Sequence, residues 1–292
     1  MDQIKIAIIG GDRRELYLAE HLANQGFSVS LSGYEKHGQL PGLNFIDPVL
    51  ACAGAQAIIM PLAGVREDLT PNCPFSSSPP QVGERFFAAI PMGIPVFIGW
   101  ARQPMIELAA SVQLVEVGED DELAILNSVP TAEGAIAIAM NETDITIHGS
   151  NCLVIGFGRC GFTLATMLQG LGGKVTVAAR KAGDAARAQQ MGMAFTHVQD
   201  LQENVQGMEF IYNTVPGVMV LSRQVLERAG NCKIIVDIAS GRGGTDFESA
   251  AQLNIKAVHA LGLPGKVAPL AAGKILTRVY PRFLKQYDVI RR

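Results

Sequence analysis

The sequence lacks an excess of positive charge. Its 292 residues include 24 Lys and Arg against 27 Asp and Glu, which gives a formal net charge of −3. Binding to nucleic acid through counterion release, or to an anionic membrane surface, depends on clustered cations. Hydrophobic residues make up 48% of the chain and charged residues 17%, a balance that excludes intrinsic disorder. We therefore expect a folded chain without a nucleic-acid or membrane partner.

Paired cysteines, long apolar runs and a leader segment are missing too. The five cysteines form no CxxC motif; they are Cys52, Cys73, Cys152, Cys160 and Cys232. An odd, scattered set predicts reduced thiols and argues against a disulfide framework or a zinc site, so we expect no metal. No apolar run approaches the roughly 18 residues of a membrane span, and the first residues lack the basic and apolar regions of a signal peptide. These features favour a cytoplasmic protein.

The chain is rich in glycine, with 31 residues, and in short aliphatic runs that alternate with segments of helical spacing. The runs predict strands at 4–9, 27–31, 57–60, 95–98 and 113–117, and again at 152–155, 174–178, 210–215, 233–238 and 255–259. Continuous apolar runs are typical of parallel strands that are buried on both faces. The pattern predicts an α/β fold of two doubly wound, Rossmann-like domains.

The two predicted domains are joined by a helix, and the first of them also takes up the last segment of the chain. A connector helix is expected from about Pro130 to Asn141, because proline fits a first helical turn. We expect residues 1–127 to form an N-terminal substrate domain, and residues 128–269 to supply the connector helix and a nucleotide-binding domain. The last segment, 270–292, is predicted to be a helix that packs back on the first domain. The proline- and serine-rich segment 71–80 predicts a loop.

One motif indicates a nucleotide. A GxGxxG sequence stands between an aliphatic strand and a helical segment; its residues are Gly156, Phe157, Gly158, Arg159, Cys160 and Gly161. In dinucleotide-binding domains the first glycine allows a tight turn, the second admits a pyrophosphate, and the third permits close packing of helix and strand. We expect these six residues to bind a cofactor, with a ligand-free glycine turn as the alternative.

The following strand bears on the choice of cofactor. Enzymes that use NAD usually carry Asp or Glu at its end, about 20 residues beyond the motif, to hold the ribose 2′-hydroxyl. This chain has Arg180 and Lys181 there instead. Both cations can pair with a 2′-phosphate, and Arg can do so through a planar fork. The sequence therefore predicts NADP, with NAD still open, while solvated loop cations are the alternative interpretation.

The ends of two later strands complete the predicted cofactor site. Ligands of open α/β sheets lie beyond the carboxyl ends of the strands. Residues of that kind are Thr214, Val215 and Pro216 at the end of one predicted strand, and Ala239 after the next. We expect them to line the nicotinamide half of the cofactor. Asp237 is interpreted as a polar group that holds neighbouring loops, with a site carboxylate as the alternative.

Longer segments resemble the A subunit of dipicolinate synthase. The resemblance rests on the Gly-rich loop and on 127–134, 143–150, 237–247 and 262–269, and it is close from about 127 to 273. Over residues 1–126 it is thinner, because mainly the opening Gly10-Gly11-Asp12-Arg13-Arg14 matches, and the loop at 71–80 has no place in the family's pattern.

The resemblance implies a fold and a reaction. The arrangement would be that of the D-2-hydroxyacid dehydrogenases, with a cleft between the domains. The reaction would oxidise a dihydrodipicolinate-type precursor to pyridine-2,6-dicarboxylate, with NADP taking the hydride. The resemblance also implies a role in sporulation and, as partner, the flavoprotein-like B subunit of dipicolinate synthase, while self-association is left open.

A substrate with two carboxylates needs cations or helix N-termini to bind it. We expect this role from Arg13, Arg14, Asn127, Thr131, Arg242 and Gly265. The catalytic residue is unassigned: the candidates are Thr131, Glu133 and His259, and water is a further proton acceptor. The ordinary alternatives are a solvated charge for each arginine and a helix cap for Thr131.

Two other functions compete with this interpretation. An NAD(P)-dependent 2-hydroxyacid or amino-acid dehydrogenase on the same scaffold would need a His–carboxylate pair or a lysine base, and the spacing of the sequence shows none. A cofactor-binding regulatory protein without catalysis of its own would keep the glycines and Arg180 but would bind no dicarboxylate.

Overall fold

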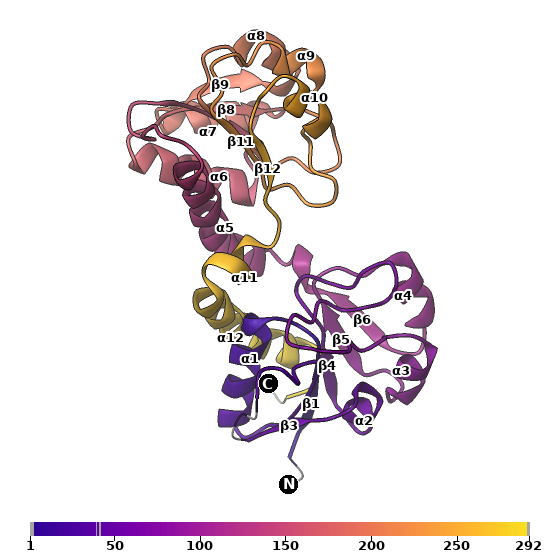
Figure 1. The fold of residues 1–292 in the computed structure, drawn as a ribbon. Helices are drawn as coiled ribbons and strands as arrows, with labels where there is room; N and C mark the ends of the chain where they lie inside the picture. Colours follow the sequence, from indigo (N-terminus) through magenta and orange to yellow (C-terminus); the bar gives the residue numbers. More distant parts are fainter. Residues whose placement is uncertain (1–2, 39, 41, 291–292) are drawn as a thin grey trace. The chain divides into compact units, whose positions relative to one another are not determined.

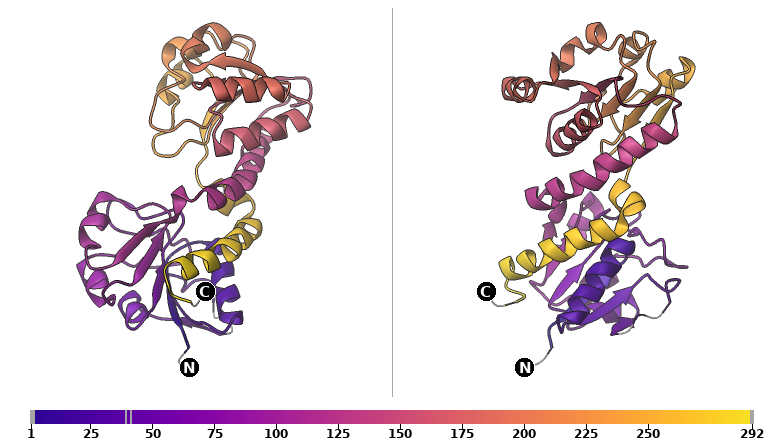
Figure 2. Two further views of the ribbon diagram at one scale, coloured as in Figure 1. Left: turned by 180° about the vertical axis from the view of Figure 1, so that it is seen from behind. Right: turned by 90° about the vertical axis from the view of Figure 1, so that its left-hand side faces the viewer.

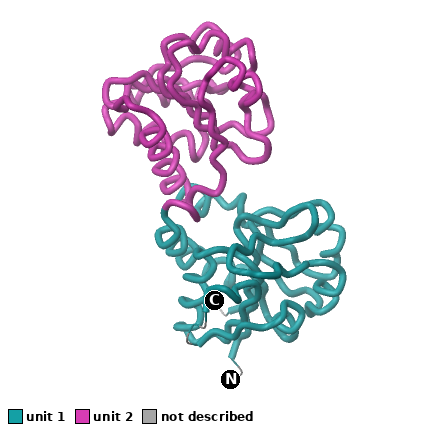
Figure 3. The backbone as a smooth tube through the Cα atoms, in the orientation of Figure 1, with its two compact units in different colours: residues 1–126, 268–292 teal, residues 127–267 magenta. Residues whose placement is uncertain are grey.

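The aliphatic runs form two six-stranded parallel sheets in the computed structural model, which describes residues 3–38, 40 and 42–290 (Figure 1). Each sheet belongs to one of two units (Figure 3). Unit 1 combines residues 1–126 with 268–292, and unit 2 comprises residues 127–267. The predicted α/β fold with two doubly wound domains is confirmed. Residues 291–292 of the predicted terminal helix lie outside the described part.

The sheet of unit 1 has the strand order β3-β2-β1-β4-β5-β6. Its strands are β1 (Lys5–Ile9), β2 (Ser28–Ser32), β3 (Leu43–Phe45), β4 (Ala57–Ile59), β5 (Pro95–Ile98) and β6 (Gln113–Glu116). Its helices are α1 (Arg13–Asn24), α2 (Pro48–Cys52), α3 (Glu84–Ala89), α4 (Gln103–Leu108), the 3-10 helix η1 (Val117–Glu119) and α12 (Pro269–Gln286). Every pairing in the sheet is parallel.

Alternate residues of the unit 1 strands enter two separate cores. Ile6 and Ile8 of β1 face a cluster with α1 and α12, whereas Ala7 and Ile9 face one with α2, α3 and α4. This is why the runs are apolar at every position. The helix α12 lies beside α1 in both views of Figure 2, and Tyr280 and Phe283 of α12 pack on Phe97 of β5.

The sheet of unit 2 has the order β12-β11-β10-β7-β8-β9, which is the same winding read from the other edge. Its strands are β7 (Asn151–Ile155), β8 (Lys174–Ala179), β9 (Ala194–His197), β10 (Phe210–Asn213), β11 (Ile234–Asp237) and β12 (Ala257–His259). Its helices are α6 (Arg159–Gly170), α7 (Ala182–Gln190), η2 (Val198–Asp200), α8 (Leu201–Asn204), α9 (Arg223–Leu226), α10 (Phe247–Gln252) and α11 (Leu263–Val267). One face is covered by α6 and by the later part of α5 (Asp121–Asn141).

The prediction that the connector helix begins near Pro130 is wrong. Helix α5 starts at Asp121, nine residues earlier, and Pro130 lies inside it. The true start has its own signal, because the side chain of Asp120 accepts a hydrogen bond from the backbone N–H of Leu123 at 3.0 Å. Proline was interpreted as an opening residue, but the helix tolerates it in its interior at the cost of one backbone hydrogen bond.

Smaller differences concern short elements. The strands β3 and β9, each at an edge of its sheet, were not predicted, because Asn44 and Thr196 interrupt their apolar residues. The predicted strand 210–215 ends at Asn213. The segment 71–80 forms no helix or strand, as predicted.

Among the residues that the structure describes, one helix, α5, is long and apolar enough to cross a membrane by length and composition alone. Its residues Ala132, Ala135, Ile136 and Ala139 are buried in the core of unit 2. A core helix of this kind passes the same test, so the finding gives little support to a membrane span.

Candidate functional site

The GxGxxG residues form a turn between β7 and α6 with the backbone that the motif predicts. Gly156 has φ +93°, a conformation that favours glycine, and Gly158 is the N-cap of α6. No side chain caps this helix, and a Cβ built on Gly158 would meet nothing within 4 Å. Among the described residues, this 12-residue helix thus begins without a capping side chain, beside a position that leaves room for a ligand. Because such a terminus attracts anions, the turn fits a diphosphate.

The third glycine allows the helix to lie close to the strand. A Cβ on Gly161 would collide with the carbonyl oxygen of Gly156, and it would stand 3.1 Å from Thr214 Oγ1. Thr214 is fixed in turn, since its hydroxyl donates to the carbonyl oxygen of Ile155 at 2.9 Å. Phe157 is buried, whereas Cys160 is half-buried and burial raises the pKa of its thiol. Cys160 therefore packs as a neutral side chain.

Arg180 and Lys181 directly follow β8, which pairs with β7. Both side chains are exposed, and Lys181 is the N-cap of α7 without a capping side chain. Within the described part of the chain, neither cation has an ion-pair partner. The nearest carboxylate along α7 is Asp184, in its first turn. The end of β8 therefore presents two uncompensated positive charges.

Asp237 is completely buried at the end of β11 and organises the loops around it. Its carboxylate accepts hydrogen bonds from the side chains of Asn213 and Thr245, at 3.0 and 2.7 Å. It also accepts from the backbone N–H groups of Ala239 and Gly244, at 3.0 and 2.8 Å. Four donors leave this group no role toward a ligand.

The same network fixes the loop that carries Thr214, Val215 and Pro216. The side-chain oxygen of Asn213 accepts from the N–H of Val215 at 3.0 Å. Further along this loop Val218 and Met219 are 55% and 58% exposed. The roles of Asn213 and Thr245 as loop anchors were not predicted, although Asn213 is a polar residue at the end of β10. The exposed apolar pair was not predicted either.

His259 ends β12, next to β11. Its Nε2 lies 3.1 Å from the carbonyl oxygen of Ala239. Because a carbonyl oxygen only accepts, Nε2 carries the hydrogen and Nδ1 of the neutral ring is an acceptor. The ring also packs on Phe247, with centroids 5.5 Å apart. Ala239 and His259 are therefore brought together at the carboxyl edge of the sheet.

The α5 residues of the predicted site are not at a helix N-terminus. Asn127, Thr131 and Glu133 lie in the interior of the helix, where the backbone N–H groups are used. The Thr131 hydroxyl donates to the carbonyl oxygen of Asn127 at 2.7 Å, and Glu133 is exposed. The expectation that this segment attracts an anion through a helix terminus is wrong, because the helix begins at Asp121. Asn127 Oδ1 is buried without a hydrogen-bond partner.

The remaining predicted residues of unit 2 lie in two further segments. Arg242 is exposed, between Gly241 and Gly243, both of which have positive φ values. It shares the loop that Asp237 anchors through Gly244. Gly265 lies in α11, which packs against α5, since a Cβ on Gly134 would be 3.1 Å from Leu263.

In unit 1 the two arginines after β1 differ. Arg13 is exposed, whereas Arg14 is 5% exposed and binds both carboxylate oxygens of Asp12 at 2.9 Å. Burial disfavours the charge of Arg14, but Glu15 and Asp12 outweigh it and raise its pKa. Burial also raises the pKa of Glu15. The fork of Arg14 is already occupied, which leaves Arg13 as the exposed cation of this turn.

Metal ligands do not gather anywhere in the described part of the chain: no group of three or more His, Cys, Asp or Glu side chains is placed to hold an ion. The five cysteines are free thiols.

Two Rossmann-type sheets, one carrying an uncapped glycine turn, define the chain as a two-domain α/β protein with the doubly wound fold. At the level of fold it is similar to D-lactate dehydrogenase from Escherichia coli, with 14% identity, a TM-score of 0.61, and coverage of 98% of this chain and 97% of the other.

Closer similarities specify the family. A family model for the N-terminal domain of the dipicolinate synthase A subunit matches residues 5–117. A curated relative, the A subunit of dipicolinate synthase from Bacillus subtilis, is 35% identical over 97% of this chain and 96% of its own length. The crystal structure of the same subunit from Bacillus halodurans has a TM-score of 0.90 at 33% identity and covers 97% of this chain and 98% of that one. The chain belongs to the family of dipicolinate synthase A subunits.

Proposed function

We propose that the chain oxidises a dihydrodipicolinate-type precursor to pyridine-2,6-dicarboxylate, with NADP as the hydride acceptor. The observation that carries the cofactor assignment is the pair Arg180 and Lys181, exposed at the end of β8 without an ion-pair partner among the described residues. A 2′-phosphate would neutralise both charges, whereas NAD would leave them unpaired. The name of the curated relative supports the choice of product.

Different residues of the chain would bind the different parts of the cofactor. The N–H groups after Gly158 would hold the diphosphate, and Arg180 and Lys181 the 2′-phosphate. Thr214, Val215 and Pro216 would lie along the nicotinamide half, because they follow β10 at the same edge. When bound, the nicotinamide ring accepts the hydride. The substrate then also loses a proton, which leaves an aromatic ring.

Arg242 is the residue of unit 2 that we assign to a substrate carboxylate. Its side chain is exposed on a loop whose base is fixed by Asp237, so a bidentate contact would cost little ordering of the backbone. Arg13 of unit 1 is a second exposed guanidinium for the same kind of contact. Arg14 would act through Asp12 by fixing the turn after β1.

For the proton acceptor we favour His259 over Thr131 and Glu133. The contact with Ala239 leaves Nδ1 of His259 as an acceptor, while Thr131 uses its hydroxyl inside α5. Glu133 is exposed on that helix. Replacing His259 by Gln keeps a polar side chain but removes the base, so kcat should fall with little change in the Kd for NADP.

The name of the relative denotes one part of a larger enzyme, and from it we propose a flavoprotein-like B subunit as partner and a role in spore formation. Absorbance in the reduced-nicotinamide band tests the function. Protein, NADP and freshly formed dihydrodipicolinate are mixed with and without the partner. A signal that appears without the partner supports catalysis by this chain. Nucleotide binding without any signal in either mixture contradicts the proposal and favours a regulatory role.

The cofactor assignment has its own test. The double variant R180A/K181A should bind NADP about 10- to 100-fold more weakly, because charge-assisted hydrogen bonds are lost, and should bind NAD nearly as before. Lys174→Ala is the matched control, since this exposed lysine lies at the opposite end of β8. Equal losses for both nucleotides would contradict the assignment to NADP.

A further inference from the structure

The two sheets share one winding, so unit 1 offers the same kind of crevice beside its first strand as unit 2. In sheets of this order a dinucleotide places its pyrophosphate at the turn after the first strand. Its ribose lies at the end of the second strand, where a carboxylate holds the hydroxyls. In unit 1, the turn after β1 and the end of β2 both differ from this arrangement.

The turn after β1 is closed by the chain itself. The N–H of Gly11 donates to the carbonyl oxygen of Asn72 at 2.7 Å, and a Cβ on Gly10 would be 2.7 Å from Cys73 Sγ. The N-terminus of α1 is capped, because Asp12 accepts from the N–H of Arg14 while Glu15 accepts from the N–H of Asp12. These amides are used, and two carboxylates lie beside them. A diphosphate is therefore excluded from this turn.

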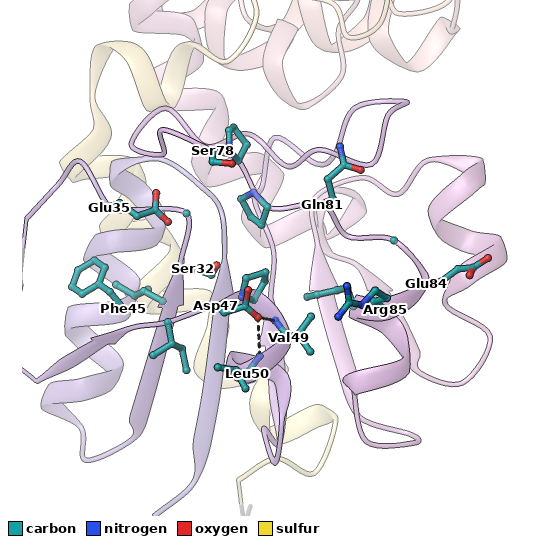
Figure 4. A pocket seen from close by; sticks show the side chains of 18 residues that line it. Ser32, Glu35, Phe45, Asp47, Val49, Leu50, Ser78, Gln81, Glu84 and Arg85 are labelled. Carbon is teal, nitrogen blue, oxygen red and sulfur yellow. Dashed lines mark hydrogen bonds between the residues drawn. The ribbon is translucent and has the colours of Figure 1, made fainter.

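The place beyond β2 is open. A pocket of about 1100 Å³ lies there, comparable with the upper end of the roughly 300–1,000 Å³ of ligand pockets. Its walls come from the end of β2, from the segment 45–50 between β3 and α2, and from the segment 78–86 that enters α3 (Figure 4). All three belong to unit 1.

The lining combines apolar walls with an excess of negative charge. Ile46, Pro79 and Pro80 supply flat or branched apolar surface. Four charged side chains line the pocket. Three of them are carboxylates, those of Glu35, Asp47 and Glu84, and one is the guanidinium of Arg85. Asp47 already accepts from the N–H groups of Val49 and Leu50, at 2.9 and 3.3 Å. A phosphate would meet a net repulsion here, whereas hydroxyl groups would find acceptors.

Glu35 is the best-placed acceptor. It comes three residues after the end of β2, where Rossmann-type units carry the carboxylate that holds ribose hydroxyls. Its side chain is exposed and, within the described residues, has no hydrogen-bond or ion-pair partner. Ser32, at the end of the strand, is 4% exposed and also lines the pocket.

We propose that this pocket of unit 1 binds a nucleoside without a phosphate group. The carboxylate of Glu35 accepts the ribose hydroxyls, and the base lies against Pro79, Pro80 and Ile46. The pocket is a half-site: the sugar and the base are recognised, while the closed turn after β1 admits no diphosphate. This assignment is independent of the reaction proposed for unit 2.

Calorimetric titration of the full chain with adenosine tests the proposal, first without and then with saturating NADP. Adenosine bound to unit 2 is displaced by NADP, whereas binding to the unit 1 pocket persists. We expect Glu35→Ala to weaken the persisting binding at least tenfold, because charge-assisted hydrogen bonds are lost. Ser78→Phe should abolish it by filling the pocket. Adenosine 5′-monophosphate should bind this site more weakly than adenosine.

The matched control is Glu107→Ala, which removes an exposed carboxylate of α4 that does not line the pocket. It should leave adenosine binding unchanged. Absence of binding at millimolar adenosine in the presence of NADP would overturn the proposal. Persisting binding that both Glu35→Ala and Ser78→Phe leave intact, or tighter binding of the monophosphate, would overturn it as well.

Discussion

A single buried carboxylate, Asp237, holds together the loops at the carboxyl edge of the unit 2 sheet. Four donors converge on it, two from side chains and two from the backbone. In Asp237→Ala they would remain buried without an acceptor, at about 1–3 kcal/mol for each unsatisfied group. We expect a loss of about 3 kcal/mol or more in the free energy of unfolding, measured by urea denaturation.

The control for this prediction lies nine residues further along. Asp246 caps α10 by accepting from the N–H of Ser249 at 3.0 Å, so Asp246→Ala removes only a helix cap and should cost much less than Asp237→Ala. If Asp237→Ala lowers the free energy of unfolding no more than Asp246→Ala does, the hydrogen bonds to Asp237 do not hold the surrounding loops in place.

Arg242 provides a second prediction at the scale of one residue. Arg242→Ala should raise the KM for the dicarboxylate about 10-fold or more, because a charge-assisted contact is lost, without changing the Kd for NADP. Steady-state kinetics and nucleotide titration measure the two effects. The unfolding midpoint should stay constant, since the side chain is exposed. Unchanged kinetics would remove Arg242 from the proposed site.

Sequence spacing was informative at residues whose role depends on their immediate neighbours. The turn conformation at Gly156 and the exposed cations at the end of β8 were foreseeable because a strand and a helix flank them. It failed where burial or the capping of a helix decides. Arg14 was expected to be accessible, but burial and Asp12 enclose its fork. Asn127 and Thr131 were misplaced because the start of α5 depends on Asp120 rather than on Pro130.

At the scale of elements, the contact between α1 and α12 depends on a glycine. A Cβ on Gly273 would be 2.7 Å from Cβ of Tyr17. Gly273→Ala should therefore lower the Tm measured by differential scanning calorimetry, although alanine is favoured over glycine by about 1 kcal/mol within a helix. Gly170→Ala is the control, because a Cβ there meets nothing within 4 Å in α6, and its Tm should stay constant or rise. Similar Tm shifts for both variants would contradict the close approach.

Helix α12 is also tied to the start of α5 by charge. Arg282 binds Asp120 at 2.7 Å and Glu122 at 3.2 Å. Partial burial opposes the charge of Asp120, but its hydrogen bond with Arg282 prevails and lowers its pKa below the ordinary 3.8. A lowered pKa in the folded state gives stability that is present above pH 3.8 and is lost as pH falls through the folded-state pKa.

The pH dependence of one variant checks this ion pair. Asp120→Asn should unfold at lower temperature than the unchanged chain at pH 7, and the difference should shrink below pH 3.8. Glu107→Gln, which changes an exposed carboxylate of α4, serves as the control for the loss of one negative charge. If the difference in unfolding temperature does not change with pH, the negative charge of Asp120 does not contribute to stability.

Element prediction succeeded where apolar runs were buried on both faces, and it missed one edge strand of each sheet. The central strands β1, β4, β7 and β10 lie where the runs predicted them, since each must fill two cores. The edge strands β3 and β9 form because a neighbouring strand supplies the hydrogen bonds. These hydrogen bonds exist only in the assembled sheet, so the residues of β3 and β9 alone do not predict them.

At the scale of the whole molecule, the two similar sheets should respond differently to NADP. Hydrogen exchange followed by mass spectrometry should show new protection in peptides that cover Gly156 to Thr166, where the amides at the start of α6 would meet the diphosphate. Peptides that cover Gly10 to Glu20 should not change, because that turn is already bonded to Asn72. Protection at both turns would show that the first turn opens to nucleotides.

Because α12 comes last in the chain but belongs to unit 1, the two units become complete at different times during synthesis. Unit 2 is one continuous stretch, so its core is complete once residue 267 has left the ribosome. Unit 1 must wait, because Leu276, Val279, Tyr280, Phe283 and Leu284 of α12 fill its core. A nascent chain stalled before residue 268 therefore carries a finished second sheet beside a first one that still exposes Leu16, Phe97 and their neighbours to chaperones.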